Sequence, residues 1–189
     1  MPMSPLPSSV PSPVVLVLAS GRGERFIASG GSGSKLQALL GGKPVLQHTL
    51  DAVRASGLRW HLEDAGHAGM GDSIAAAVAA TPDASGWLIL PGDLPLIQAA
   101  TLRTVAQALA HHQAVLPLCG GQRGHPVGFA AVCAGELLAL EGNQGAAKVL
   151  RALEAINSVA FLDLEDIGSV TDIDSLDDLA RAEALLQTR

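Results

Sequence analysis

An aliphatic run that leads directly into a glycine turn, at residues 14–26, restricts the possible folds of this chain more than any other segment. Its first five residues are all aliphatic, which is typical of a strand covered on both faces in the parallel sheet of an α/β protein. Gly21 and Gly23 follow, and small residues leave backbone amides open to a ligand. Arg22 and Arg25 add charge that can bind phosphate oxygens. The segment predicts a phosphate-binding turn after a buried strand, and a surface turn with solvated arginines is the alternative.

Strand and helix patterns alternate along the rest of the chain. Short apolar runs predict strands, the one at 58–62 weakly, and apolar residues spaced three and four apart predict helices. This alternation favours a mostly parallel sheet with helices on both faces, which binds ligands at the carboxyl ends of its strands. The predicted strands are 14–18, 58–62, 87–90, 114–118, 127–132 and 159–164, and the predicted helices contain residues 46–53, 74–78, 102–109, 146–153 and 176–186.

Length and charge limit the class of protein. A chain of 189 residues has the length of one domain, which we expect at 14–189 after a disordered, proline- and serine-rich tail at 1–13 that lacks the apolar segment of a signal peptide. The net charge of −6 argues against nucleic-acid binding.

No apolar run approaches the roughly 20 residues that span a membrane. Cys119 and Cys133 lack metal-ligand spacing and predict buried free thiols in a cytoplasmic protein.

Two common phosphate-binding motifs are missing from the sequence. There is no G-x-x-x-x-G-K-[ST], and Phe26 stands where G-x-G-x-x-G has its third glycine. A P-loop ATPase is therefore excluded and a nicotinamide-dependent dehydrogenase is disfavoured. The glycine turn and Asp93, in P-G-D-L-P, each follow a predicted strand. A phosphate-binding turn and a carboxylate are therefore expected at the same edge of the sheet.

The chain contains L-A-S-G-R-G-E-R-F, Lys35 and G-G-K-P-V-L-Q-H-T-L, and then L-P-G-D-L-P. In this combination it resembles the MobA-like nucleotidyltransferases that act on molybdenum cofactor. The resemblance continues through G-M-G-D-S-I, G-H-P-V-G-F, G-N-Q-G-A and T-D-I-D-S-L-D-D-L, which look more like the cytidylyl-transferring branch. It covers residues 14–186.

The resemblance implies a three-layer, Rossmann-like fold of the nucleotide-diphospho-sugar transferase type. It also implies Mg²⁺-dependent transfer of a nucleoside monophosphate, CMP from CTP, to molybdopterin or molybdenum cofactor, with release of pyrophosphate. A molybdoenzyme or its chaperone would be a partner. A related transferase that uses GTP or a sugar phosphate is one alternative. A noncatalytic protein that delivers cofactor or nucleotide is an alternative of another class.

Asp93 is the expected Mg²⁺ ligand, because a hard cation prefers carboxylate oxygens together with substrate phosphates. A turn aspartate that bonds its own backbone is the alternative reading. The resemblance places the second metal ligand at Asp172, with Asp174 as the alternative ligand. Asp174 or Ser175 is expected to cap the terminal helix, and Asp174 is the better placed of the two acids for that role. Both acids could instead be helix-end residues.

The resemblance also assigns the nucleotide and acceptor contacts. A glycine- and serine-rich insertion at 27–34 separates Lys35 from the arginines, and we expect it to form a mobile lid. Lys43 is the alternative phosphate ligand, and segment 57–69 is shorter than is usual in the family. The triphosphate is assigned to Arg22, Arg25 and Lys35, the base to the backbone of Leu18, Ala19, Ser20 and Gly21, the base and ribose to Gly71, Asp72 and Ser73, and the acceptor to His125. Helix capping by Asp72 or Ser73, and simple exposure of His125, are the structural alternatives.

Overall fold

Seven strands form one mixed sheet in the computed structural model, which describes residues 12–21 and 23–188 of the chain. Strand β1 (Val14–Leu18) pairs in parallel with β4 (Arg59–Glu63) on one side and β5 (Gly86–Pro91) on the other. Strand β8 (Val127–Ala130) lies antiparallel between β5 and β6 (Ala114–Cys119). Strand β9 (Val159–Asp163) is parallel to β6, and β7 (Gln122–Arg123) forms a short hairpin with the end of β6.

The predicted mostly parallel sheet is confirmed, with β7 and β8 as its antiparallel strands. The loop at 120–126, with β7 inside it, is too short for the crossover of a dozen or more residues that a parallel return requires. The chain therefore returns next to β6 in the opposite direction. The apolar run at 127–132 is only partly strand, because a 3-10 helix (Ala131–Cys133) begins after β8.

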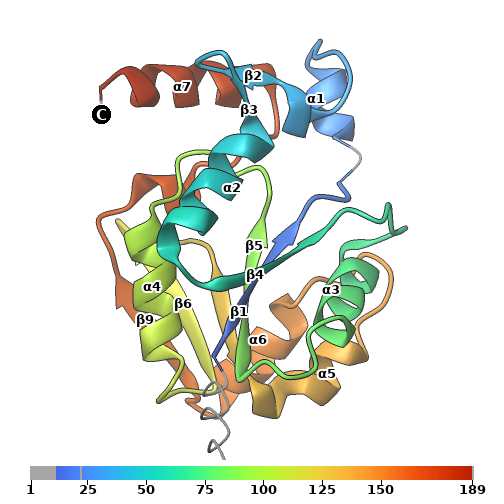
Figure 1. Ribbon diagram of the computed structural model, residues 1–189, viewed down its shortest axis with the longest axis vertical. Helices are drawn as coiled ribbons and strands as arrows, with labels where there is room; N and C mark the ends of the chain where they lie inside the picture. The colour runs from blue at the N-terminus through green and yellow to red at the C-terminus, as the bar shows by residue number, and fades with distance from the viewer. Residues whose placement is uncertain (1–11, 22, 189) are drawn as a thin grey trace, which may run out of the picture.

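Helices cover both faces of the sheet, as alternation of side chains along β1 requires. Val14 and Leu16 pack under α3 (Met70–Ala79), α5 (Ala134–Leu138) and α6 (Ala147–Ala155). Val15 and Val17 pack against α2 (Val45–Ser56) and α4 (Ala99–Ala108) on the other face. Figure 1 shows these two helical layers on either side of the strands. The three-layer prediction is confirmed.

A small cap lies beyond the carboxyl ends of β1 and β5 (Figure 1). It consists of α1 (Glu24–Ala28), a 3-10 helix (Lys35–Gln37), the hairpin of β2 (Leu39–Leu40) and β3 (Lys43–Pro44), and α7 (Leu176–Gln187). A further 3-10 helix (Ile167–Val170) leads toward it. Phe26, Leu36 and Ile173 form part of its buried core. The Ser29 hydroxyl accepts a hydrogen bond from Leu176 N at 3.0 Å, so the insertion contacts the start of α7.

Helix ends confirm some predictions and correct others. Gly57, with φ of 71°, ends α2 in the left-handed conformation that favours glycine. Ser175 caps α7, because its hydroxyl accepts from Asp178 N at 3.2 Å. Of the two expected caps, Ser175 is confirmed and Asp174 was wrong. Capping of α3 by Asp72 or Ser73 was also wrong, since the cap residue is Gly69.

Three further sequence expectations concern the cysteines, membrane-spanning segments and the N-terminal tail. Cys133 is buried, whereas Cys119 is only half-buried, and both are free thiols. No helix within residues 12–21 and 23–188 is long and apolar enough to cross a membrane. Residues 1–11 of the expected tail, and Arg22, one of the predicted phosphate ligands, lie outside the described residues.

Candidate active site

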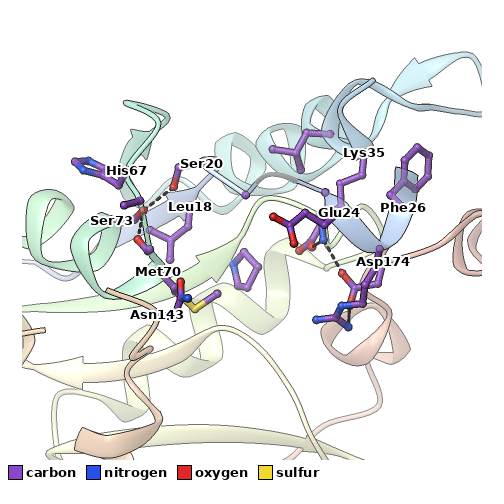
Figure 2. Close-up of a pocket in the computed structure, with 18 residues that line it drawn as sticks. Leu18, Ser20, Glu24, Phe26, Lys35, His67, Met70, Ser73, Asn143 and Asp174 are labelled. Carbon is purple, nitrogen blue, oxygen red and sulfur yellow. Dashed lines mark hydrogen bonds and ion pairs between the residues drawn. The ribbon is translucent and has the colours of Figure 1, made fainter. Parts of the chain in front are cut away.

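A cleft of about 400 Å³ opens at the carboxyl ends of β1 and β5. Two groups of side chains line it from opposite sides (Figure 2). Ser20, after β1, and Ser73, on α3, belong to one side, and Lys35 and Asp174, from the cap, belong to the other. Asp93 follows β5 and also lines the cleft. The register of β1 on β5 pairs Leu18 with Pro91, so the segments after both strands meet here.

Asp93 and Lys35 form the most buried ion pair of the cleft. Lys35 Nζ lies 2.5 Å from Asp93 Oδ2, and each side chain is 12% exposed. Burial acts to lower the pKa of Lys35, but the charges of Asp93 and Asp174 and their hydrogen bonds outweigh it and raise the pKa above 10.5. Lys35 is therefore a fixed positive charge at neutral pH. Asp93 Oδ1 is buried without a hydrogen-bond partner among the described residues.

Asp174 joins Lys35 to Arg25 across the mouth of the cleft. Its Oδ1 accepts from Lys35 Nζ at 2.7 Å, and its Oδ2 accepts from Arg25 Nη1 at 2.5 Å. The insertion at 27–34 therefore does not keep the two cations apart. Arg25 is 82% exposed and Lys35 only 12%, so Arg25 lies at the solvent side of this group. Arg25 and Lys35, two of the three predicted phosphate ligands, line the cleft.

The turn after β1 is held from both neighbouring strands. Ala19 N donates to Glu63 O at 2.8 Å, and Leu18 O accepts from Gly92 N at 2.9 Å. Ser20 Oγ lies 2.5 Å from Ser73 Oγ, which also donates to Gly69 O at 3.1 Å. These contacts fix the backbone that the family resemblance assigns to the base. Leu18, Ser20, Gly21 and Ser73 line the cleft.

Asp172 and His125 lie near Asp93 but are not among the residues that line the cleft. Burial and the negative charges of Asp93 and Asp174 raise the pKa of Asp172. Burial lowers the pKa of His125, although the charges of Asp93 and Asp172 oppose this effect. His125 is therefore neutral near pH 7, and its buried Nδ1 has no hydrogen-bond partner within the described part of the chain.

Gly71 and Asp72 contact a neighbouring loop and do not line the cleft. Gly71 N donates to Gly142 O at 2.8 Å, and Asp72 Oδ1 accepts from Gly142 N at 3.1 Å. These bonds attach the start of α3 to the segment before α6. Lys43 pairs with Asp51 at 2.8 Å, away from the cleft. The structure therefore brings Lys35, not Lys43, to the predicted phosphate site.

Several residues of the site were not found in the sequence. Asp174 was expected as a helix cap or as the alternative metal ligand, not as a partner of Lys35 and Arg25. His67, Met70 and Asn143 line the cleft without having been singled out. Glu63 ends β4, and its carboxylate accepts from Ala65 N at 3.2 Å and contacts His67 at 3.0 Å. An acidic residue at the end of the strand beside β1 was a signal available in the sequence, but the strand at 58–62 was too weak to place it.

The donor set suits a hard divalent cation that is shared with a substrate. Among the described residues, no group of three or more His, Cys, Asp or Glu side chains is arranged to hold a metal by itself. Mg²⁺ commonly binds one or two carboxylates and completes its shell with water and substrate phosphates. The buried, unpartnered Asp93 Oδ1 fits that pattern, and the charge of Asp93 also reaches the carboxyl of Asp172, whose pKa it raises.

The α/β sheet, the cleft at its carboxyl edge and a family match over more than half of the sequence together indicate a nucleotidyltransferase. The family model of the MobA-like NTP transferase domain matches residues 50–156, more than half of the sequence. The chain belongs to the MobA-like NTP transferase family.

A curated relative matches most of this chain. The bifunctional protein GlmU of Dechloromonas aromatica is 25% identical over 170 residues, which cover 76% of this chain and 36% of GlmU. The chain therefore spans about a third of the length of this relative.

Solved structures share the fold. Rv0371c of Mycobacterium tuberculosis has a TM-score of 0.76 at 23% identity, covering 92% of this chain and 98% of that one. The same protein has also been solved as a manganese complex, with a TM-score of 0.71 at 22% identity, covering 93% of this chain and all of that one. The molybdopterin-guanine dinucleotide biosynthesis protein A of Archaeoglobus fulgidus has a TM-score of 0.62 at 19% identity, covering 93% of this chain and all of that one.

Proposed function

We propose that this protein transfers a nucleoside monophosphate, CMP from CTP, to the phosphate of molybdopterin or molybdenum cofactor and releases pyrophosphate. One observation carries the proposal above others. Asp93 Oδ1 is buried and unpartnered among the described residues, in a cleft that also contains Lys35 and Arg25. A carboxylate oxygen with no donor, beside fixed positive charges, suits a metal-nucleotide complex better than it suits the interior of a protein.

Charge complementarity supports a triphosphate as the ligand. A nucleoside triphosphate carries about four negative charges near neutral pH, and transfer reactions at phosphorus depend mainly on positioning and charge neutralisation. We assign Lys35, Arg25 and Arg22 to the triphosphate. The backbone of Leu18, Ala19, Ser20 and Gly21 is assigned to the base.

Asp93 and Asp172 are the proposed ligands of the divalent cation, Mg²⁺. When bound, the cation would neutralise phosphate charge and polarise the phosphorus–oxygen bonds. The manganese complex of Rv0371c supports a divalent cation in this fold. Mg²⁺ is our choice because the proposed ligands are all oxygens.

The reaction needs no protein nucleophile. An oxygen of the acceptor phosphate attacks the α-phosphorus of the nucleotide, and the bond from that phosphorus to the pyrophosphate oxygen breaks in line. Gly71, Asp72 and Ser73 are proposed to support the base and ribose, and neutral His125 to contact the acceptor. Asp72 acts indirectly, since its carboxylate holds Gly142 N at 3.1 Å.

The base is the least constrained part of the proposal. The segments at 69–74 and 124–129 favour CTP through their resemblance to the cytidylyl-transferring branch. The name of the A. fulgidus neighbour contains a guanine dinucleotide, which makes GTP the second candidate. We place the reaction in the cytoplasm, where both cysteines would remain free thiols. A molybdoenzyme or its chaperone would receive the product.

A nucleotide and acceptor panel tests the function. Thermal shifts with CTP, GTP, ATP and UTP plus Mg²⁺ identify the preferred nucleotide, because a ligand at 100 times its Kd stabilises the native state by about 2.7 kcal/mol. Pyrophosphate release is then measured with molybdopterin and with sugar phosphates as acceptors. We expect release with CTP and molybdopterin. Release only with a sugar phosphate would reassign the acceptor, and nucleotide binding without release from any pair would indicate a delivery protein.

A further inference from the structure

Lys35 is bonded to two carboxylates and does not point freely into the cleft. Its Nζ lies 2.5 Å from Asp93 Oδ2 and donates to Asp174 Oδ1 at 2.7 Å. Figure 2 shows Lys35 on the same side of the cleft as Asp174. An ammonium has three N–H donors, so these two carboxylates leave one of them for a phosphate oxygen. Lys35 can give the triphosphate more than one hydrogen bond only if it leaves a carboxylate.

The two carboxylate oxygens of Asp93 have different surroundings. Its Oδ2 holds the Lys35 ammonium, while its buried Oδ1 has no partner among the described residues. A divalent cation on this carboxylate would lie next to the ammonium, and two positive charges repel each other strongly where both are shielded from solvent. Asp93 therefore cannot bind both cations equally well.

We propose that Lys35 exchanges partners during binding. In the nucleotide-free protein its ammonium occupies the cation position at Asp93, and it moves from Asp93 to the triphosphate when a divalent cation binds. Lys35 thereby keeps the carboxylates neutralised until metal and nucleotide arrive. The inference rests on the proposed function, because it assumes the metal at Asp93 and the triphosphate in this cleft.

The local structure permits this exchange. Lys35 begins a 3-10 helix of three residues, and its flexible four-carbon side chain can move without movement of the backbone. Arg25 also pairs with Asp174, at 2.5 Å, so Asp174 keeps a cationic partner when Lys35 leaves. Asp93 has no second cation among the described residues that could take the place of Lys35 in this way.

Metal binding without nucleotide tests the exchange. Mn²⁺ alone is titrated into the full chain and its binding is followed by electron paramagnetic resonance. We expect Lys35→Met to bind Mn²⁺ at least about tenfold more tightly than the unchanged protein, equivalent to about 1.4 kcal/mol. The same variant should bind CTP with Mg²⁺ more weakly, because the triphosphate loses a cation. Equal or weaker Mn²⁺ binding by Lys35→Met would overturn the inference.

Arg25→Met is the matched control. It removes one positive charge from the same group, but Arg25 is bonded to Asp174 and not to Asp93. Its side chain is 82% exposed, so we expect Mn²⁺ affinity to rise by about twofold or less. An equal gain in both variants would mean that charge alone, and not vacated space at Asp93, controls metal binding. That result would also overturn the inference.

A measurement on the unchanged protein does not depend on the folding of a variant. The chain contains three lysines, at 35, 43 and 148, so the ammonium signals of ¹⁵N-labelled lysine can be assigned individually. The Lys35 signal should shift on saturation with Mg²⁺ alone, while the Lys43 signal, from an ion pair with Asp51, should not. An unchanged Lys35 signal in metal-saturated protein would contradict the exchange.

The two proposals can fail separately. Mn²⁺ binding that persists undiminished in Asp93→Asn would place the metal elsewhere and contradict both the proposed site and the exchange. Mn²⁺ binding that is lost in Asp93→Asn but unchanged in Lys35→Met would contradict the exchange alone. Pyrophosphate release by the unchanged protein tests the proposed function independently of either result.

Discussion

The hydroxyl oxygens of Ser20 and Ser73 lie 2.5 Å apart and join the turn after β1 to the first turn of α3. This single bond connects the two segments that the proposed function assigns to the nucleoside. Ser73 also donates to Gly69 O at 3.1 Å, so the pair is positioned by the backbone of the helix start.

A double-mutant cycle measures this connection. Ser20→Ala and Ser73→Ala should each weaken nucleotide binding, and their effects on the free energy of unfolding should be coupled by about 0.5–1.5 kcal/mol, the usual contribution of one hydrogen bond. Chemical denaturation of the two single variants and the double variant gives the coupling. Strictly additive effects would mean that the bond does not form in solution.

Asp93→Asn should reduce pyrophosphate release by about 100- to 1000-fold, the usual cost of removing one electrostatic contact to a transition state. The fold should persist, because the amide has nearly the same size. Steady-state kinetics and circular dichroism check the two parts. Asp51→Asn is the control, since Asp51 pairs with Lys43 on the surface and is 44% exposed. Near-normal turnover in Asp93→Asn would refute the metal assignment.

Two glycines in the segments assigned to the nucleoside should respond differently to substitution by alanine. A Cβ on Gly71 would come within 2.7 Å of Glu141 O and Gln144 O. Gly71→Ala should therefore lower the free energy of unfolding by about 1–3 kcal/mol, the usual cost of overpacking. A Cβ on Gly21 would meet nothing within 4 Å, so Gly21→Ala should leave Tm unchanged and weaken nucleotide binding by filling the cleft. Thermal unfolding and nucleotide titration separate these outcomes, and equal Tm losses would contradict the packing argument.

Glu63 should make stability depend on pH. Burial acts to raise the pKa of Glu63, but the bond from Ala65 N and the contacts with His61 and His67 outweigh it and lower the pKa below 4.5. Because the folded-state pKa is depressed, the stabilisation is present above pH 4.5 and is lost as the pH falls through the folded-state value.

Glu63→Gln should therefore lower the free energy of unfolding by about 1–3 kcal/mol at pH 7, and the difference should shrink below pH 4.5. Denaturant titrations at several pH values measure it, with the exposed neighbour in Asp64→Asn as the control. A difference that stays constant down to pH 3 would contradict the assigned role of the carboxylate.

Sequence patterns predicted the main layers because they depend on local periodicity. The aliphatic residues of β1 alternate between two buried faces, and the spacing in α2 and α4 places one apolar side of each helix on the sheet. Strand β4 was weakly predicted because it is an edge strand, and its Arg59 and Trp60 are exposed. Edge strands bury little on one side, so their residues carry a weak hydrophobic signal.

The sequence by itself determined which segments follow the buried strands, and so it placed Asp93 and the glycine turn at one edge of the sheet. Parallel pairing aligns strand ends, so residue order was sufficient for that result. Only the tertiary structure decided the partners of Asp174. Local capping preferences favoured a helix-end role, but packing of Ile173 and α7 in the cap brings Asp174 to Lys35, 139 residues earlier. Contacts between such distant residues depend on how the elements pack, and local sequence patterns do not contain that information.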